Sequence, residues 1–231
     1  MTSTRARRSR QIFLGVVAAL AFVQLISGCS SAPTKENSQA NPETGNSSFC
    51  EPATAIEHAA PTVASPTQYL ERKKFILTLT TNCGEIQIEA DAEQAPATVT
   101  AIGHLANAKY FDSTLCHRLT TSGIFVLQCG DPTASGSGGP GFTFADENLP
   151  TAGGVNYPKG TVAMANSGPN TNGSQFFLVY ADTTLAPNYS IWGTVTKGID
   201  LLEKIAAIGT SDGGPDGAPK YPIEIRTARL Q

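Results

Sequence analysis

Eight short segments in the C-terminal part of the chain have the apolar patterns of β-strands, and turn-forming residues separate them. Their ranges are 75–80, 85–89, 115–119, 125–128, 161–165, 175–180, 191–195 and 223–226. The first two flank Thr81, Asn82, Cys83 and Gly84, a turn sequence that predicts a hairpin. Because a sheet of so many short strands leaves exposed edges unless it closes, we expect a mainly β fold, a closed eight-stranded antiparallel barrel.

Two amphipathic helices are expected to cap this barrel, one over each end. Pro96 begins the first, where its fixed φ suits the first helical turn, and residues 199–208 form the second. Their apolar stripes are Val99, Ile102, Leu105 and Ala106 in the first helix and Leu201, Leu202, Ile205 and Ile208 in the second. We assign residues 72–231 to a single domain.

The N-terminus has the pattern of a signal peptide over residues 1–28. A basic start precedes an apolar run from Ile12 to Ile26, about 15 residues and so shorter than the ~20 that a membrane-spanning helix needs. The ending Leu-Ile-Ser-Gly-Cys29 resembles the lipobox of bacterial lipoproteins, whose cysteine carries a diacylglycerol. An ordinary secretory signal or an uncleaved span is the alternative. We expect lipidation of Cys29 and a protein anchored to the extracytoplasmic face of the bacterial cell membrane.

Residues 29–71 are rich in Ser, Thr, Pro, Ala and Asn, and their apolar residues follow no period. This composition predicts a flexible tether between the lipid and the domain. A coil of ~40 residues reaches about 35 Å, which would hold the domain away from the membrane surface.

The basic residues concentrate in the leader. Four of the 16 basic residues are Arg5, Arg7, Arg8 and Arg10, so the remaining chain carries 12 basic against 19 acidic side chains. Binding of nucleic acid needs clustered lysine and arginine that displace phosphate counterions. We therefore expect no nucleic-acid partner.

Besides Cys29 the chain has four cysteines, Cys50, Cys83, Cys116 and Cys129, which can pair in three ways outside the cytoplasm. Cys116 and Cys129 lie on neighbouring predicted strands, whereas Cys50 precedes the core and Cys83 lies in its first turn. We favour the disulfides 116–129 and 50–83. A zinc site is the alternative, but the chain lacks a Cys-x-x-Cys pair and has 3 histidines, so we expect no metal.

Three segments in order resemble the cyclophilin family of peptidyl-prolyl isomerases. They are residues 116–118 (CHR), 125–131 (FVLQCGD) and 164–177 (MANSGPNTNGSQFF). The third is long and specific, and the resemblance extends from Phe75 to the end of the chain. It implies the cyclophilin-like barrel expected above and rotation about the amide bond that precedes a proline.

The resemblance also assigns roles to individual residues. Arg118 occupies the position of the family's catalytic arginine, and an arginine suits the task because it is always charged and carries five donors. The expected substrate-binding residues are Phe125, Val126, Phe177 and Leu185 as an apolar floor, with Gln128, Ala165, Asn166, Ser167, Gln175 and Tyr189 as further contacts. No cofactor is implied. Strand alternation independently places Gln175 and Phe177 on one face.

The chain departs from the family pattern around this site. Cys116 replaces a phenylalanine, and the segment between Arg118 and Phe125 is about two residues longer. A residue such as Thr184 stands where many eukaryotic members have a rim tryptophan. Tyr189 stands where they have a histidine. Because that tryptophan is associated with cyclosporin, we expect weak cyclosporin binding.

The expected partners are proline-containing polypeptides, and we expect a monomer that speeds folding of secreted or cell-envelope proteins. The alternative is a proline-peptide binding module or chaperone with little turnover. The presence of Arg118 favours the enzyme, because a binding module would tolerate the loss of this arginine first.

Overall fold

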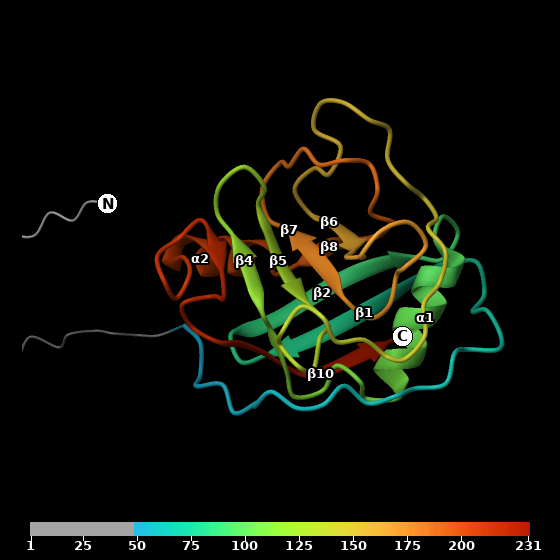
Figure 1. The fold of residues 1–231 in the computed structure, drawn as a ribbon, viewed down its shortest axis with the longest axis horizontal. Coiled ribbons are helices and arrows are strands. Elements are labelled where there is room, and N and C mark those ends of the chain that lie inside the picture. Colours follow the sequence, from blue (N-terminus) through green and yellow to red (C-terminus); the bar gives the residue numbers. More distant parts are fainter. Residues whose placement is uncertain (1–48) are drawn as a thin grey trace, which may run out of the picture. The chain divides into compact units, whose positions relative to one another are not determined.

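Ten strands pair into one curled antiparallel sheet in the computed structural model, which describes residues 49–231 (Figure 1). The strands are β1 (Lys74–Thr81), β2 (Gly84–Asp91), β3 (Thr114–Cys116), β4 (Arg118–Thr120), β5 (Val126–Cys129), β6 (Thr161–Met164), β7 (Phe176–Val179), β8 (Ile191–Lys197), β9 (Asp216–Gly217) and β10 (Ile223–Leu230). Hydrogen-bonded neighbours follow the order β3-β10-β1-β2-β8-β6-β7-β5-β4-β9. The mainly β prediction is confirmed, although the expected number of strands was eight.

The two additional strands have separate origins. The segment expected at 115–119 divides at His117, so that β3 pairs with β10 while β4 pairs with β5. The backbone N–H of His117 still donates to the carbonyl of Gln128 at 3.1 Å. Strand β9 is only two residues long and adds to the outer edge of β4. The strand order begins at β3 and ends at β9, so the sheet is not closed by one continuous hydrogen-bonded ladder. The chain itself joins its two halves, because β3 runs directly into β4.

The two helices lie where the apolar stripes predict them. Helix α1 (Pro96–Asn107) and helix α2 (Ile199–Ile208) lie at opposite ends of the sheet (Figure 1). Pro96 is in the first turn of α1. In α1, Val99, Ile102 and Leu105 are fully buried. In α2, Leu201, Leu202 and Ile205 are at least nine-tenths buried.

The central strands have apolar residues on both faces, because successive side chains point to opposite sides. Leu127 and Phe176 belong to the main core, whereas Val126 and Phe177 belong to a second, smaller cluster on the other face. This second cluster supports the surface that carries the candidate site.

Residues 49–71, which we call the strap, are extended and lie along the edge of the domain (Figure 1). Cys50 is disulfide-bonded to Cys83, and the backbone N–H groups of His58 and Val63 donate to Pro132 and Pro140 at 3.0 and 2.8 Å. The prediction of a flexible tether is therefore wrong for this part of 29–71, because specific hydrogen bonds and a disulfide dock it.

The predicted signal peptide 1–28, the lipidated Cys29 and the first part of the predicted tether lie outside the described residues. Within residues 49–231 no helix is long and apolar enough to cross a membrane.

Candidate active site

A small pocket of about 170 Å³ opens on the face that the second apolar cluster supports. It is lined by Arg118, Ile124, Val126, Gln128, Ala165, Asn166, Phe177, Leu185 and Tyr189. Strand β4 supplies Arg118, β5 supplies Val126 and Gln128, and β7 supplies Phe177, whereas the other five residues lie outside the strands. Eight of the eleven residues that the family resemblance assigned to the site therefore line one pocket.

The floor of the pocket is apolar and rigid. Val126 is 2% exposed and Phe177 is 5% exposed. The ring of Phe177 meets that of Tyr189 edge to face, with centroids 5.6 Å apart, and also packs against Tyr157. Packed aromatic side chains lose little freedom when a ligand binds, so this floor is ready to accept an apolar ring.

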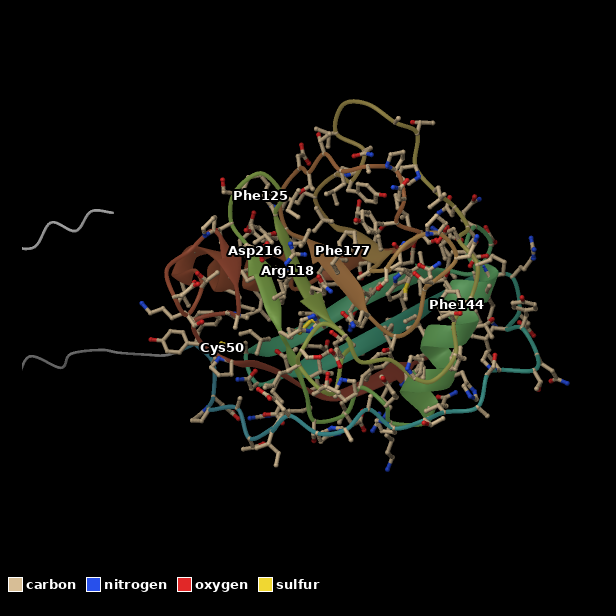
Figure 2. All side chains as sticks on the ribbon, in the orientation of Figure 1. Cys50, Arg118, Phe125, Phe144, Phe177 and Asp216 are labelled. Carbon is tan, nitrogen blue, oxygen red and sulfur yellow. A yellow bond between two sulfur atoms is a disulfide. The ribbon has the colours of Figure 1, made fainter. Side chains whose placement is uncertain are left out.

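One rim of the pocket is the guanidinium of Arg118, which lies beside Asp216 (Figure 2). The Nε and Nη2 atoms of Arg118 donate to the two carboxylate oxygens of Asp216 at 2.8 and 2.7 Å. Nη1 donates to Oε1 of Gln128 at 3.2 Å, and Gln128 in turn donates to Gln175 at 2.9 Å. These bonds use three of the five N–H donors of Arg118 and leave one on Nη1 and one on Nη2 for a ligand.

The ion pair perturbs both partners. Its hydrogen bonds lower the pKa of the Asp216 carboxyl below its ordinary value and raise the pKa of Arg118. Both groups are therefore charged throughout the neutral range. The Arg118 side chain remains 39% exposed, so a peptide can reach it.

Asp216 was not among the residues predicted from the sequence. It lies in a glycine-rich segment that reads as a turn, and its two-residue strand β9 is too short to show alternation. Only the pairing of Thr120 with Asp216 in the β4–β9 ladder brings this carboxylate to Arg118.

Phe125, predicted as part of the floor, does not line this pocket. Phe125 packs against the main core, where its ring meets that of Tyr180 at 6.0 Å, and Ile124 lines the pocket instead. Ile124, Val126 and Gln128 are two residues apart and share a face, whereas Phe125 lies on the opposite face. Strand alternation alone predicts that Phe125 faces away from Ile124 and Val126, whereas the family resemblance placed Phe125 on the floor.

A second, wider cavity of about 680 Å³ adjoins the pocket. Ser167 and Gln175, also predicted as substrate contacts, lie here rather than in the first pocket, while Gln128, Ala165 and Asn166 line both. Residues 136–143 form one wall of this cavity, and Nε2 of Gln175 donates to the carbonyl of Gly138 at 2.9 Å. The two hollows form one groove with a polar partition between them.

Two residues outside the predicted set position the loop that carries Leu185 and Tyr189. The side-chain amide of Asn156 donates to the carbonyl of Leu185 at 2.7 Å and accepts from its N–H at 3.0 Å. The hydroxyl of Tyr157 donates to the carbonyl of Tyr189 at 3.1 Å. Both residues are at least nine-tenths buried, so the loop is held from inside the protein.

The second disulfide joins β3, which directly precedes the strand that carries Arg118, to β5, which carries Gln128. Cys116 at the end of β3 is bonded to Cys129 at the end of β5. These residues lie next but one to Arg118 and directly beside Gln128. The structure thus contains both disulfides that the positions of the cysteines favoured.

A curled antiparallel sheet with a helix at each end defines a mainly β, barrel-like protein, and its apolar surface pocket has a fixed arginine at the rim. The family model described as "Cyclophilin type peptidyl-prolyl cis-trans isomerase/CLD" matches residues 76–230. This chain belongs to the cyclophilin-type peptidyl-prolyl cis-trans isomerase family.

Similar proteins agree with this assignment. "Probable peptidyl-prolyl cis-trans isomerase B" of Mycobacterium leprae is 47% identical over 164 residues, covering 66% of this chain and 55% of the relative. The protein of that name from Mycobacterium tuberculosis is 44% identical over 169 residues, covering 67% and 54%. The chain spans about half the length of these curated relatives.

A cyclophilin-type isomerase from Cryptosporidium parvum has a similar fold. Its crystal structure superposes with a TM-score of 0.59 at 27% identity, covering 69% of this chain and 98% of that chain. A second crystal structure of it, obtained in the presence of the dipeptide Ala-Pro, gives a TM-score of 0.58, also at 27% identity, and covers 68% of this chain and 98% of that one.

Proposed function

We propose that this chain catalyses cis/trans isomerisation of peptide bonds that precede proline, with no cofactor. The observation that carries the proposal is the guanidinium of Arg118, held by Asp216 and Gln128 at the rim of an apolar pocket with two donors free. Membership of the isomerase family and the Ala-Pro dipeptide used with the Cryptosporidium relative support it.

The chemistry requires no bond to be made or broken. Rotation about the amide is slow because the nitrogen lone pair is delocalised into the carbonyl, which gives a barrier of about 18–20 kcal/mol. A hydrogen bond donated to the prolyl nitrogen favours its pyramidal form, in which this delocalisation is lost. Arg118 is the catalytic residue in this proposal, because it lines the pocket and keeps one donor on Nη1 and one on Nη2 for a ligand.

The pocket would hold the pyrrolidine ring while the rest of the peptide turns. Val126, Phe177 and Leu185 would contact the ring, together with Ile124. Gln128 and Asn166 would bond to the peptide backbone from the partition between the two hollows. Contacts that are stronger in the twisted state than in the planar one accelerate the reaction, about tenfold for each 1.4 kcal/mol.

The test is the rate of cis-to-trans conversion of a proline peptide with the full chain and with Arg118→Ala. The enzyme proposal expects clear acceleration by the wild type and near-spontaneous relaxation with the variant, at unchanged fold. Equal rates for both would favour the alternative, a proline-peptide binding module.

We further propose that the protein acts outside the cytoplasm, anchored through Cys29, on secreted or cell-envelope proteins. The lipobox-like sequence and the two disulfides support this location, because disulfides persist in oxidising compartments. Metabolic labelling with a fatty acid should mark the wild type and not Cys29→Ala. Labelling of both proteins would overturn the anchor.

Weak cyclosporin binding belongs to the same proposal. Thr184, on the pocket-bearing loop, is a small residue whose hydroxyl donates to the carbonyl of Gly154 at 2.7 Å, and Tyr189 is the aromatic residue of this rim. We expect Thr184→Trp to bind cyclosporin more tightly than the wild type. A nanomolar dissociation constant for the wild type would contradict this.

A further inference from the structure

The strap lies outside the part of the chain that matches the family model, which begins at residue 76. It nevertheless follows the domain from the α2 end to the α1 end (Figure 1). On this path it contacts the domain at its start, in its middle and near its end.

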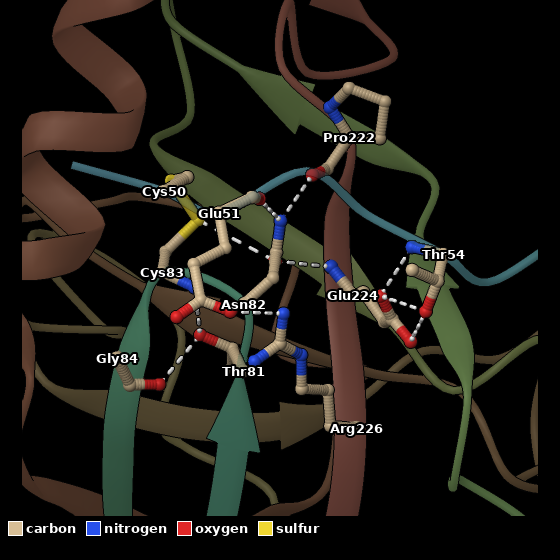
Figure 3. A network of polar contacts seen from close by, with 10 residues as sticks. All are labelled: Cys50, Glu51, Thr54, Thr81, Asn82, Cys83, Gly84, Pro222, Glu224 and Arg226. Carbon is tan, nitrogen blue, oxygen red and sulfur yellow. Dashed lines mark hydrogen bonds and ion pairs between the residues drawn. A yellow bond between two sulfur atoms is a disulfide. The ribbon is translucent and has the colours of Figure 1, made fainter. Parts of the chain in front are cut away.

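The start of the strap is anchored in a buried polar network (Figure 3). Cys50 is bonded to Cys83, and the N–H of Glu51 donates to the carbonyl of Asn82 at 2.8 Å. The side-chain amide of Asn82, itself 4% exposed, donates to the carbonyl of Glu51 at 2.8 Å. Glu51 also pairs with Arg226 at 2.6 Å.

A buried carboxylate makes this anchor obligatory. Glu224 is 2% exposed, and its carboxylate accepts hydrogen bonds from the N–H of Thr54 at 2.7 Å and from the Thr54 hydroxyl at 3.2 Å. Both donors belong to the strap. Removing them would leave a buried charge without its partners, which is costly.

The middle of the strap meets the wall of the second cavity. The N–H of His58 donates to the carbonyl of Pro132 at 3.0 Å, and the N–H of Val63 donates to that of Pro140 at 2.8 Å. The methyl group of Thr62 lies so near Gly141 that a Cβ added there would be 2.9 Å from it. Residues 136–143, which line the cavity, are thus held from behind by the strap.

The end of the strap is fixed to α1. The ring Nε2 of His104 is 2.9 Å from the carbonyl of Ala64, and the N–H of Leu70 donates to the hydroxyl of Thr100 at 3.0 Å. The segment that touches the cavity wall is therefore held between two fixed points.

We propose that the strap is a specificity-determining element of the groove. It keeps the wall of the second cavity in position to bind the peptide residues that flank the proline, and the Cys50–Cys83 disulfide keeps the strap docked. The proposal rests on the proposed isomerase function, but it concerns the second cavity and not the pocket beside Arg118.

Two variants of the full chain release the strap in different ways. Cys50→Ser with Cys83→Ser removes the covalent anchor, and Val63→Pro removes the N–H that bonds to Pro140. Ile56→Pro is the matched control, because the N–H of Ile56 has no acceptor within residues 49–231 and the residue is 78% exposed. Hydrogen exchange of the His58 amide reports docking of the strap in all proteins.

The measurement compares a blocked Ala-Pro dipeptide with a longer peptide that has a central Ala-Pro bond. For both release variants we expect KM of the longer peptide to rise about tenfold at similar kcat, while kcat/KM of the dipeptide changes less than about twofold. The control should match the wild type with both peptides.

The outcomes separate the two proposals. An equal loss with both peptides, or no change although the His58 amide has lost its protection, would overturn the role of the strap. If the wild type accelerates neither peptide, the isomerase proposal fails. The strap is then tested by titration of the two peptides, and we expect the release variants to raise the dissociation constant of the longer peptide but not that of the dipeptide. If the serine variant does not fold, Val63→Pro decides.

Discussion

The side chains of Arg118 and Asp216 meet edge to edge, with Nε and Nη2 of the arginine 2.8 and 2.7 Å from the two carboxylate oxygens. The two residues are 98 positions apart in the chain. A bidentate pair fixes the plane of a guanidinium as well as its position. Asp216 is therefore a positioning residue for the proposed catalytic group.

Asp216→Asn should lower kcat more than it raises KM, because the plane of the Arg118 guanidinium is then less well fixed while the apolar floor is intact. A half-exposed ion pair contributes up to about 1 kcal/mol, so we expect a loss of up to about fivefold. Asp200→Asn, which alters an exposed carboxylate on α2 paired with Lys204, is the control. An unchanged kcat for Asp216→Asn would exclude the positioning role.

Ile124→Ala should affect peptide binding and Phe125→Ala should affect stability, although the two residues are adjacent. Ile124 lines the pocket, so its truncation should raise KM with little loss of stability. Phe125 packs on the core against Tyr180, so its truncation should cost about 1–3 kcal/mol of unfolding free energy and leave kcat/KM near the wild-type value. Denaturant unfolding and the isomerase assay measure the two effects. The reverse pattern would mean that Phe125 faces the ligand.

Tyr180 should give the protein an alkaline stability limit. Burial raises the pKa of Tyr180 to about 12, and its hydroxyl donates to the carbonyl of Thr120. The unfolded chain loses this proton near pH 10 and the folded chain does not, so stability is fully present below pH 10 and falls as the pH rises toward 12. Tyr180→Phe should be less stable at neutral pH by about 1–2 kcal/mol because the Thr120 carbonyl loses its partner.

The difference in unfolding free energy between wild type and Tyr180→Phe, followed from pH 8 to 12, isolates this group. Tyr110 and Tyr157, whose pKa values burial also raises, contribute equally to both proteins. The difference should be constant up to about pH 10 and then shrink. A difference independent of pH would contradict the raised pKa.

Replacing Cys116 and Cys129 together by alanine should destabilise the protein without abolishing activity. The disulfide closes a loop with a separation of 13 residues, and such a loop contributes about 3 kcal/mol. The ladder that pairs Arg118 with Gln128 persists without it. We expect a lower Tm and a smaller loss of kcat/KM than in Arg118→Ala. Loss of all activity in a folded variant would show that the covalent link itself positions Arg118.

Much of the fold follows from local sequence patterns. Each of the eight expected segments forms strand, and both helices span the expected residues, because apolar periodicity reports which side chains are buried. The division at His117 has no such signature, because it depends on two different partners, β10 and β5.

The site was predicted where the family motifs are continuous and missed where they are not. Arg118, Gln128 and Phe177 line the pocket, as the motifs imply, whereas Ile124, which lies outside the motifs, lines it as well. The strap has the composition of a flexible linker, and its docking depends on pairs as distant as Thr54 and Glu224, 170 residues apart. Composition carries no information about such pairs.

Binding and turnover of an Ala-Pro peptide, measured separately by exchange NMR with wild type and Arg118→Ala, test most directly whether the apolar pocket holds proline while one guanidinium lowers the barrier. We expect the variant to bind the peptide within about threefold of the wild type but to exchange it at least about a hundredfold more slowly, a difference of about 2.7 kcal/mol in the barrier. Exchange at the wild-type rate by a folded Arg118→Ala protein would contradict the role of Arg118.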